Sequence, residues 1–210
     1  MTRLLLATTN RGKLTELAPV LARCGWETVG LAELSGVPVA AEDGATLAEN
    51  ARSKALHYAR ATGLAALADD SGLCVEALGG APGVRSARFA GPAASDADNR
   101  RRLLAELAGR AGRRAHFACA LCLAEPVHGG DGRLRLTEVE GRCDGRLLEA
   151  ERGTGGFGYD PLFVADDPRA GGRTFAELSR EQKEQLSHRG RALEALAQRL
   201  AGRAAPGAAR

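Results

Sequence analysis

The chain contains a short apolar run that ends directly in two carboxylates. Residues 64–68 (Leu-Ala-Ala-Leu-Ala) have the length and composition of a short buried strand. Asp69 and Asp70 follow at once, and the next two residues, Ser71 and Gly72, are typical of a turn. We therefore expect the aspartates to leave the carboxyl end of a strand, where open α/β sheets form their ligand crevices.

Two interpretations of this Asp-Asp-Ser-Gly segment are open. In the first, the carboxylates accept hydrogen bonds from nearby backbone N–H groups in an Asx turn and have no further role. In the second, one carboxylate faces a ligand. Because successive residues of a strand point to opposite faces, only one of Asp69 and Asp70 can face that ligand directly. Turn chemistry alone favours the first interpretation, and the rest of the chain favours the second.

Strands and helices alternate before this segment. Residues 3–7 form an apolar run of strand type, and an amphipathic helix opens at Gly12-Lys13 and stops at Cys24-Gly25. A second helix over residues 46–61 leads into the strand at 64–68. This order of strand, helix, loop, helix and strand predicts an α/β fold.

The remaining elements follow from the same signals. We expect a helix over 96–107, strands over 115–124 and 134–141 with a turn-rich connection over 127–132, and closing helices over 180–186 and 189–200. Residues 201–210 are rich in Ala, Gly and Arg and predict a frayed, disordered tail. At 210 residues the chain has the length of one domain, which we place at residues 1–200.

The composition favours a soluble cytoplasmic protein with a small anionic substrate. No apolar stretch is long enough to span a bilayer, and residues 1–3 lead into the first strand without the pattern of a signal peptide. The net charge of +3 is modest, and the arginines are spread among acids. With one tryptophan and two tyrosines for base stacking, neither a nucleic-acid partner nor a membrane partner is expected.

The five cysteines are odd in number and scattered, which argues against a disulfide framework and suits a reducing compartment. Cys119 and Cys122 form a C-x-x-C, but they lie in a β-like run that would place them on opposite faces of a strand. We interpret them as buried structural thiols rather than as a metal-binding or redox pair.

Two glycine motifs suggest nucleotide folds but lack the required context. Residues 153–158 satisfy G-x-G-x-x-G, yet no strand precedes them and Pro161 prevents a helix directly behind them. Gly12-Lys13 resembles part of a P-loop, but Ala7 and Leu14 stand where that motif needs a glycine and a Ser or Thr. What remains is a helix N-terminus with one lysine, which is a good anion site.

Polar groups of functional type occur in four separated segments. They are residues 8–13 (Thr-Thr-Asn-Arg-Gly-Lys), residues 49–55 (Glu-Asn-Ala-Arg-Ser-Lys-Ala), residues 68–73 continuing to 80–89, and residues 156–161 with 176–178, Lys183 and 187–189. In this order and spacing the chain, from about Arg3 to about Leu200, resembles the inosine triphosphate pyrophosphatase family, the noncanonical purine nucleoside triphosphate diphosphatases. One segment alone would be weak support, whereas four in register are strong support.

The resemblance implies a fold and an activity. The fold is α/β, with a long mixed central sheet flanked by helices and two lobes with a substrate groove between them. The activity is the Mg²⁺-dependent hydrolysis of dITP, ITP and XTP to the monophosphate and pyrophosphate, which removes these nucleotides from the pool. The resemblance also implies a homodimer.

Individual residues take roles from the same resemblance. It makes Asp70 the catalytic base and a metal ligand, and it makes Glu42 the other metal-linked acid. The implied substrate-binding residues are Thr8, Thr9, Asn10, Arg11, Gly12, Lys13 and Ser71 for the triphosphate, and Phe157, Gly158, Tyr159, Asp160, Lys183, His188 and Arg189 for the rest of the nucleotide. Three positions depart from the family pattern or leave it open: Thr9 stands where glycine is common, Arg85 replaces a frequent tyrosine, and Asp69 beside Asp70 leaves the metal ligands open.

The chemistry of these residue types supports those roles. Magnesium takes hard oxygen ligands and is held by one or two carboxylates together with substrate phosphates, which Glu42, Asp70 and a triphosphate would supply. Attack on the α-phosphorus needs cations such as Lys13 and Lys183 to neutralise the developing charge. A carboxylate beside the attacking water can orient and deprotonate it.

Recognition of the base is expected in the last segment. His188 and Arg189 can donate to O6 of a 6-keto purine, and the amine of adenine would leave these donors unpaired. Phe157 or Tyr159 is expected to stack on the base. Residues 187–189 (Ser-His-Arg) are also typical of a helix N-cap followed by first-turn polar residues, and both descriptions can hold together.

Two other functions are compatible with parts of the sequence. A noncatalytic nucleotide-binding or RNA-binding module would use the same fold and its scattered arginines, and it would bind RNA with a steep salt dependence. A nucleotide-dependent oxidoreductase is suggested by residues 153–158 alone, and failure to bind NAD or flavin would exclude it.

Overall fold

The computed structural model describes residues 2–127 and 132–201. Its strands are β1 (Thr2–Leu6), β2 (Trp26–Gly30), β3 (Ala65–Val75), β4 (Arg114–Pro126), β5 (Leu134–Leu147) and β6 (Phe163–Ala165). Its α-helices are α1 (Arg11–Arg23), α2 (Leu47–Thr62), α3 (Asp96–Glu106), α4 (Arg180–Leu186) and α5 (His188–Ala201). Short 3-10 helices include η1 (Leu31–Glu33), η2 (Glu76–Leu78), η3 (Gly83–Arg88), η4 (Pro168–Ala170) and η5 (Phe175–Glu177).

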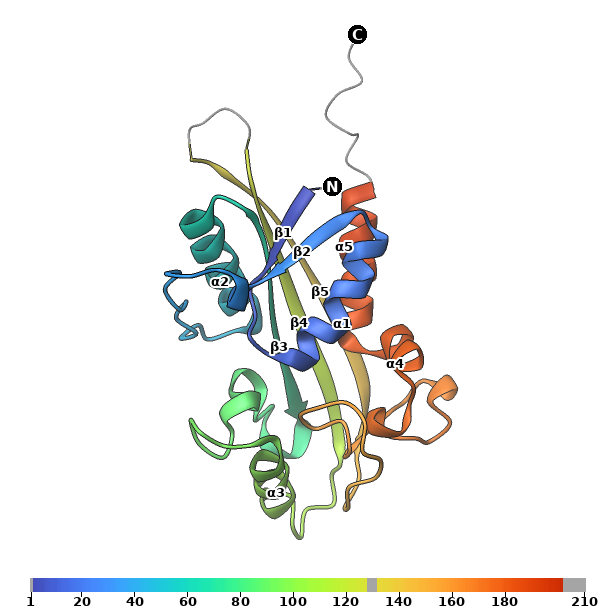
Figure 1. Ribbon diagram of the computed structural model, residues 1–210. Coiled ribbons are helices and arrows are strands. Elements are labelled where there is room, and N and C mark those ends of the chain that lie inside the picture. The colour runs from blue at the N-terminus through green and yellow to red at the C-terminus, as the bar shows by residue number, and fades with distance from the viewer. Residues whose placement is uncertain (1, 128–131, 202–210) are drawn as a thin grey trace.

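The described strands form one mixed sheet in the order β2-β1-β3-β4-β5-β6. β1 pairs in parallel with β2 and with β3, whereas the pairs from β3 to β6 are antiparallel. β3, β4 and β5 have 11, 13 and 14 residues, and in Figure 1 they run from an upper lobe, which holds β1, β2, α1, α2 and α5, into a lower lobe, which holds α3. The expected long mixed sheet with flanking helices is confirmed.

Helices cover both faces of the upper part of the sheet (Figure 1). On one face, α2 packs Ala51, Ala55 and Tyr58 against small side chains of β3 and β4. On the other face, α1 and α5 bury leucines such as Leu17 and Leu193 against β1, β3 and β4. Because both faces of β3 are covered here, the strand reads as a continuous apolar run and not as an alternating one.

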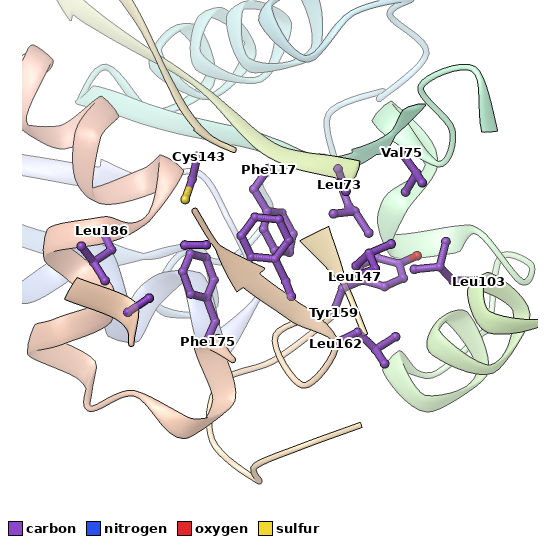
Figure 2. Packing of buried hydrophobic residues seen from close by; sticks show 14 of the residues in the cluster. Leu73, Val75, Leu103, Phe117, Cys143, Leu147, Tyr159, Leu162, Phe175 and Leu186 are labelled. Carbon is purple, nitrogen blue, oxygen red and sulfur yellow. The ribbon is translucent and has the colours of Figure 1, made fainter. Parts of the chain in front are cut away.

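The lower lobe has its own core, built around aromatic rings (Figure 2). Phe117 of β4 stacks on Phe175 of η5 with ring centroids 5.9 Å apart, and it meets Phe163 of β6 edge-on at 4.7 Å. Tyr159 is 4% exposed in this core, and its hydroxyl donates to the Ser86 carbonyl at 2.9 Å. The contacts of Tyr159 hold the end of the glycine-rich segment, residues 153–158, close to this core.

The structure corrects the predicted position of the two aspartates. β3 continues to Val75, so Asp69 and Asp70 lie in the middle of the strand and belong to its ladder with β4, which replaces the Asx turn. Gly72 also lies within β3 and makes no turn. A Cβ at Gly72 would overlap the carbonyl of Gly83, so this glycine permits the close approach of two backbone segments.

Most of the other predicted elements are confirmed, with small shifts at their ends. α4 has the predicted bounds, and α2 begins after the N-cap Thr46 and ends at Gly63, whose φ of 70° is left-handed. β5 continues to Leu147 instead of ending at Gly141. Most of the predicted connection at 127–132 and nearly all of the predicted tail at 201–210 lie outside the described residues. None of the described helices combines the length and apolarity needed to cross a membrane.

The two cysteines of the C-x-x-C lie on opposite faces of β4, as expected. Cys119 belongs to the core beneath α1 and α5, whereas Cys122 belongs to the core beneath α2. Both are buried, and burial raises the pKa of Cys122 to about 12. The prediction that both thiols are buried, on opposite faces of the strand, is confirmed.

Candidate active site

A cavity of about 550 Å³ lies between the two lobes and is lined by residues from both. The predicted site residues that line it are Thr8, Thr9, Asn10, Lys13, Glu42, Asp70, Ser71, Phe157, Gly158, Tyr159, Asp160, Lys183, His188 and Arg189. Arg11 and Gly12 are not among the lining residues, and neither is Arg85, which is exposed. The four separated sequence segments therefore meet around one cavity.

The start of α1 forms one wall of the cavity. The Asn10 side chain accepts a hydrogen bond from the Lys13 backbone N–H at 3.1 Å, which makes Asn10 the N-cap of the helix. Thr8 Oγ1 accepts from the Asn10 N–H at 3.2 Å and shapes the loop before the cap. Because a helix N-terminus carries partial positive charge and Lys13 adds a full charge, this wall suits an anionic group.

Asp69 is a fully buried anion behind this wall. Its carboxylate lies 2.5 Å from Lys13 Nζ and 2.7 Å from Arg189 Nε, and the Cys119 thiol donates to it at 3.2 Å. Burial alone would raise the pKa of Asp69, but Arg189 and Lys13 hold it well below its usual range. Asp69 is therefore a structural anion that keeps two cations in place.

Asp70 points to the opposite face of β3, into the cavity. Its Oδ2 accepts from Asn50 Nδ2 at 3.0 Å, and its Oδ1 lies 3.3 Å from Lys54 Nζ. Lys54 Nζ also lies 3.0 Å from Glu42 Oε1, so one ammonium group joins the two carboxylates. Burial raises the pKa of Asp70 despite the opposing effect of Lys54, which makes this carboxylate a better proton acceptor than a free aspartate.

Glu42 and Asp70 have the chemistry of a site for a hard divalent cation. Their carboxylates share the Lys54 ammonium and both line the cavity. Oxygen ligands of this kind suit Mg²⁺, which usually combines one or two carboxylates with phosphate oxygens and water. Among the described residues, no group of three or more His, Cys, Asp or Glu is placed to hold a metal ion. Two carboxylates alone would leave the other coordination positions of such a cation to water or ligand oxygens.

Phe157 and Lys183 form another wall. Lys183 Nζ lies 2.5 Å from Asp160 Oδ2 and 4.7 Å from the centroid of the Phe157 ring. The Phe157 backbone N–H donates to the same Asp160 carboxylate at 2.9 Å, so the buried acid fixes both residues. The half-buried ring of Phe157 lines the cavity and is suited to stacking on a planar ligand. Tyr159, the other candidate for stacking, is held in the lower core by its bond to Ser86.

The first turn of α5 supplies His188 and Arg189. Ser187 Oγ accepts from the Gly190 N–H at 3.1 Å, so the predicted N-cap is confirmed. Arg189 Nη2 donates to Ser71 Oγ at 2.8 Å in addition to the contact of the guanidinium with Asp69. Arg189 is only 2% exposed, so most of its donors are committed to neighbours within the protein.

His188 is buried and stacks face to face on Phe117, with ring centroids 4.7 Å apart. Burial and the nearby Arg189 hold the pKa of His188 well below its usual range, so the imidazole is neutral. Its Nδ1 is buried and has no hydrogen-bond partner among the described residues. The ring thus has a fixed orientation and a fixed charge at the edge of the cavity.

The residues missing from the sequence-based set include Lys54, Asn50 and Glu16, each of which contacts a predicted site residue. Lys54 and Asn50 share the buried stripe of α2 with alanines, and polar residues on such a stripe were a signal that could have found them. Glu16, on α1, contacts Lys183 and Arg189, which lie more than 160 positions away along the chain. No local pattern predicts a contact at that separation.

Comparisons with known proteins agree with this geometry. A sequence model described as the Ham1 family matches residues 4–199. The chain belongs to the Ham1 family. Within it, the chain is similar to a dITP/XTP pyrophosphatase of Desulfotalea psychrophila, with 50% identity over 90% of this chain and 81% of that protein.

Two other known proteins are similar over nearly their full length. A dITP/XTP pyrophosphatase of Streptomyces coelicolor is 51% identical over 93% of this chain and 96% of that protein. The solved structure of a HAM1 protein from Coxiella burnetii has a TM-score of 0.83 and 40% identity, and it covers 97% of this chain and 100% of that one. The resemblance stated from the sequence is therefore confirmed at the level of the family and the fold.

Proposed function

We propose that this chain hydrolyses deaminated purine nucleoside triphosphates, namely dITP, ITP and XTP, to the monophosphate and pyrophosphate. One observation carries the proposal: a single cavity holds the carboxylates Glu42 and Asp70 beside the cations Lys13 and Lys54. Polyanion hydrolysis needs this combination of proton acceptor and positive charge. Membership in the Ham1 family, with relatives named dITP/XTP pyrophosphatases, supports the same activity.

The proposed reaction transfers the α-phosphoryl group to water. The water oxygen attacks the α-phosphorus, and the bond from that phosphorus to the oxygen bridging to the β-phosphate breaks, so pyrophosphate leaves. Asp70 accepts the proton of the attacking water, because it faces the cavity and its pKa is raised. Lys13, Lys54 and the N–H groups at the start of α1 offset the negative charge that grows on the phosphate oxygens.

We assign Mg²⁺ to Glu42 and Asp70 as the cofactor. When bound, this cation would polarise the phosphate oxygens and draw the triphosphate toward the two carboxylates. In the structure the Lys54 ammonium pairs with both carboxylates, so it would compensate their charge before the cation binds. Thr8, Thr9, Asn10 and Ser71 supply further polar contacts for the phosphates along the same wall.

We assign recognition of the base to His188 and Phe157. An unpaired buried acceptor costs less than an unpaired buried donor, and Nδ1 of His188 has no partner among the described residues, so we assign the proton to Nε2. A neutral Nε2–H can donate to O6 of a 6-keto purine, whereas the amine of adenine would leave it unpaired. Phe157 supplies the apolar surface on which the base stacks.

Replacing Gly12 with alanine should weaken nucleotide binding without stabilising the helix. At an open helix position, replacing glycine with alanine raises the free energy of unfolding by roughly 1 kcal/mol. Here the new Cβ would lie 2.7 Å from Cγ of Phe157, so the ring must leave its present position, 4.7 Å from Lys183 Nζ. We expect the KM for dITP to rise about tenfold, a common size for a displaced binding contact. A Gly12→Ala protein with unchanged KM and higher stability in urea would contradict this packing.

Three broader properties are part of the proposal and need their own tests. We propose a homodimer, one domain over residues 1–200 and a cytoplasmic location. Light scattering at several protein concentrations tests the dimer, and limited proteolysis tests the domain boundary. Localisation of the tagged full chain by fractionation tests the compartment.

Pyrophosphate release from dITP, XTP and dATP by the purified protein tests the activity. We expect kcat/KM for dITP and XTP to exceed that for dATP by roughly 10²–10⁴-fold, the range available to a site that leaves a donor unpaired with the wrong base. Chelation with EDTA should stop the reaction, and added Mg²⁺ should restore it. Absence of pyrophosphate from dITP, or equal rates on dATP, would overturn the proposal. Salt-dependent RNA binding without hydrolysis would instead support the noncatalytic module.

A further inference from the structure

Glu16 forms ion pairs with Lys183 and Arg189, two cations that lie beside the Phe157 ring. It lies on α1, one turn after Lys13, and its side chain is 17% exposed. Its Oε1 accepts from Lys183 Nζ at 2.6 Å, and its Oε2 accepts from Arg189 Nη1. Glu16 does not line the cavity between the lobes, although both of its cation partners do. Its effect on a ligand must therefore pass through Lys183 and Arg189.

These contacts are part of a longer chain of alternating charge. In order, the chain is Lys13, Asp69, Arg189, Glu16, Lys183 and Asp160, and each neighbouring pair is a direct ion pair. Three cations and three anions balance, and none of the six side chains is more than 17% exposed. Because buried charges depend on their neighbours for compensation, the removal of one member affects those on either side.

Glu16 fixes the two cations with respect to one aromatic ring. Lys183 Nζ lies 4.7 Å and Arg189 Cζ lies 5.6 Å from the centroid of the Phe157 ring. With Glu16 neutral, the two cations would repel each other more strongly, and each would keep one other buried acid, Asp160 for Lys183 and Asp69 for Arg189. Asp160 and Asp69 each hold one cation, so among these contacts no shared carboxylate would then join the two cations beside the Phe157 ring.

We propose that Glu16 is a positioning residue that holds Lys183 and Arg189 beside the Phe157 ring, on which the base stacks. Because Glu16 shares α1 with Lys13, it also links this ring to the phosphate-binding start of α1. The inference rests on the proposed hydrolysis of deaminated purine nucleotides and names a residue that sets the affinity for their bases. Glu16 itself does not contact the substrate in this proposal.

Glu16→Gln tests this inference, because glutamine keeps the size of the side chain but removes its charge and one acceptor. We expect the KM for dITP to rise about tenfold with kcat changed less than about threefold, the pattern of lost binding contacts remote from the reacting atoms. Inorganic tripolyphosphate, a competitor without a base, should inhibit the variant and the wild type with the same Ki. A general loosening of the site would instead weaken the binding of dITP and of tripolyphosphate to a similar extent.

Glu184→Gln is the matched control. Glu184 forms an ion pair with Arg23 on the neighbouring surface, where its side chain is 31% exposed, and it has no role in the cavity. This variant should keep the wild-type KM. If Glu16→Gln is poorly folded, Glu16→Asp retains the charge but is too short to reach both cations, and it should show a smaller rise in KM for dITP alone.

The outcomes separate the two proposals. If the wild type releases pyrophosphate from dITP and Glu16→Gln has an unchanged KM, or if Ki for tripolyphosphate rises as much as KM for dITP, the positioning role is overturned and the proposed function stands. If the wild type does not act on dITP, the proposed function fails and the inference that rests on it fails too.

Discussion

Replacing Asp70 with asparagine should lower kcat/KM for dITP by roughly 10²–10⁴-fold, the usual contribution of a general base. The variant should stay folded. Asp70 is buried at a cost that raises its pKa, and a neutral amide avoids that cost. Lys54 would retain Glu42 and the Asp69 carbonyl, which it contacts at 3.0 Å, so it is not left without acceptors. We expect the free energy of unfolding to change by no more than about 1 kcal/mol, the net value of one hydrogen bond.

Two measurements on the same preparation check this result. Pyrophosphate release gives kcat/KM, and urea denaturation gives the free energy of unfolding. An Asp70→Asn protein that is as active as the wild type would remove Asp70 from the catalytic role. A protein that is inactive because it is unfolded would show that the buried carboxylate is needed for stability.

Replacing Asp69 with asparagine, in contrast to Asp70→Asn, should mainly reduce stability. We expect the free energy of unfolding to fall by about 3–5 kcal/mol, as when one partner of a buried ion pair is removed. Arg189 and Lys13 would lose a carboxylate whose side chain is 0% exposed, and Arg189 itself is 2% exposed. For a chain of this length the loss corresponds to a midpoint of thermal unfolding lower by roughly 6–20 °C.

Asp144→Asn is the control for that substitution. Asp144 pairs with Arg142 on the surface, where both side chains are more than half exposed, and such pairs contribute at most about 1 kcal/mol. Thermal unfolding of the two variants and the wild type makes the comparison. If Asp69→Asn is no less stable than Asp144→Asn, the buried charge cluster around Asp69 is not what holds α1 and α5 against β3.

These two neighbouring acids show how far the sequence could be interpreted. Strand alternation correctly predicted that Asp69 and Asp70 point to opposite faces, and only Asp70 lines the cavity. The predicted strand was too short, because Ser71-Gly72 has the composition of a turn. At Gly72 the absence of a side chain leaves room for the carbonyl of Gly83. Gly83 belongs to a later segment, so the local sequence around Gly72 does not reveal this contact.

The helices were predicted well because their signals are local. Thr46 caps α2 and Gly63 ends it, and both act on neighbours within one turn. The site was predicted less completely, since Lys54 was noted within its motif but received no role. Its role depends on two acids, Glu42 and Asp70, that tertiary structure brings to it.

The three long strands have a consequence for how the groove between the lobes can open. β3, β4 and β5 cross from one lobe to the other without interruption, and their ladders are continuous through the level of Asp69. Within the described residues, the two lobes are therefore joined by three hydrogen-bonded strands. A ligand that enters the groove passes its rim, where Val39 is 90% exposed and lines the cavity.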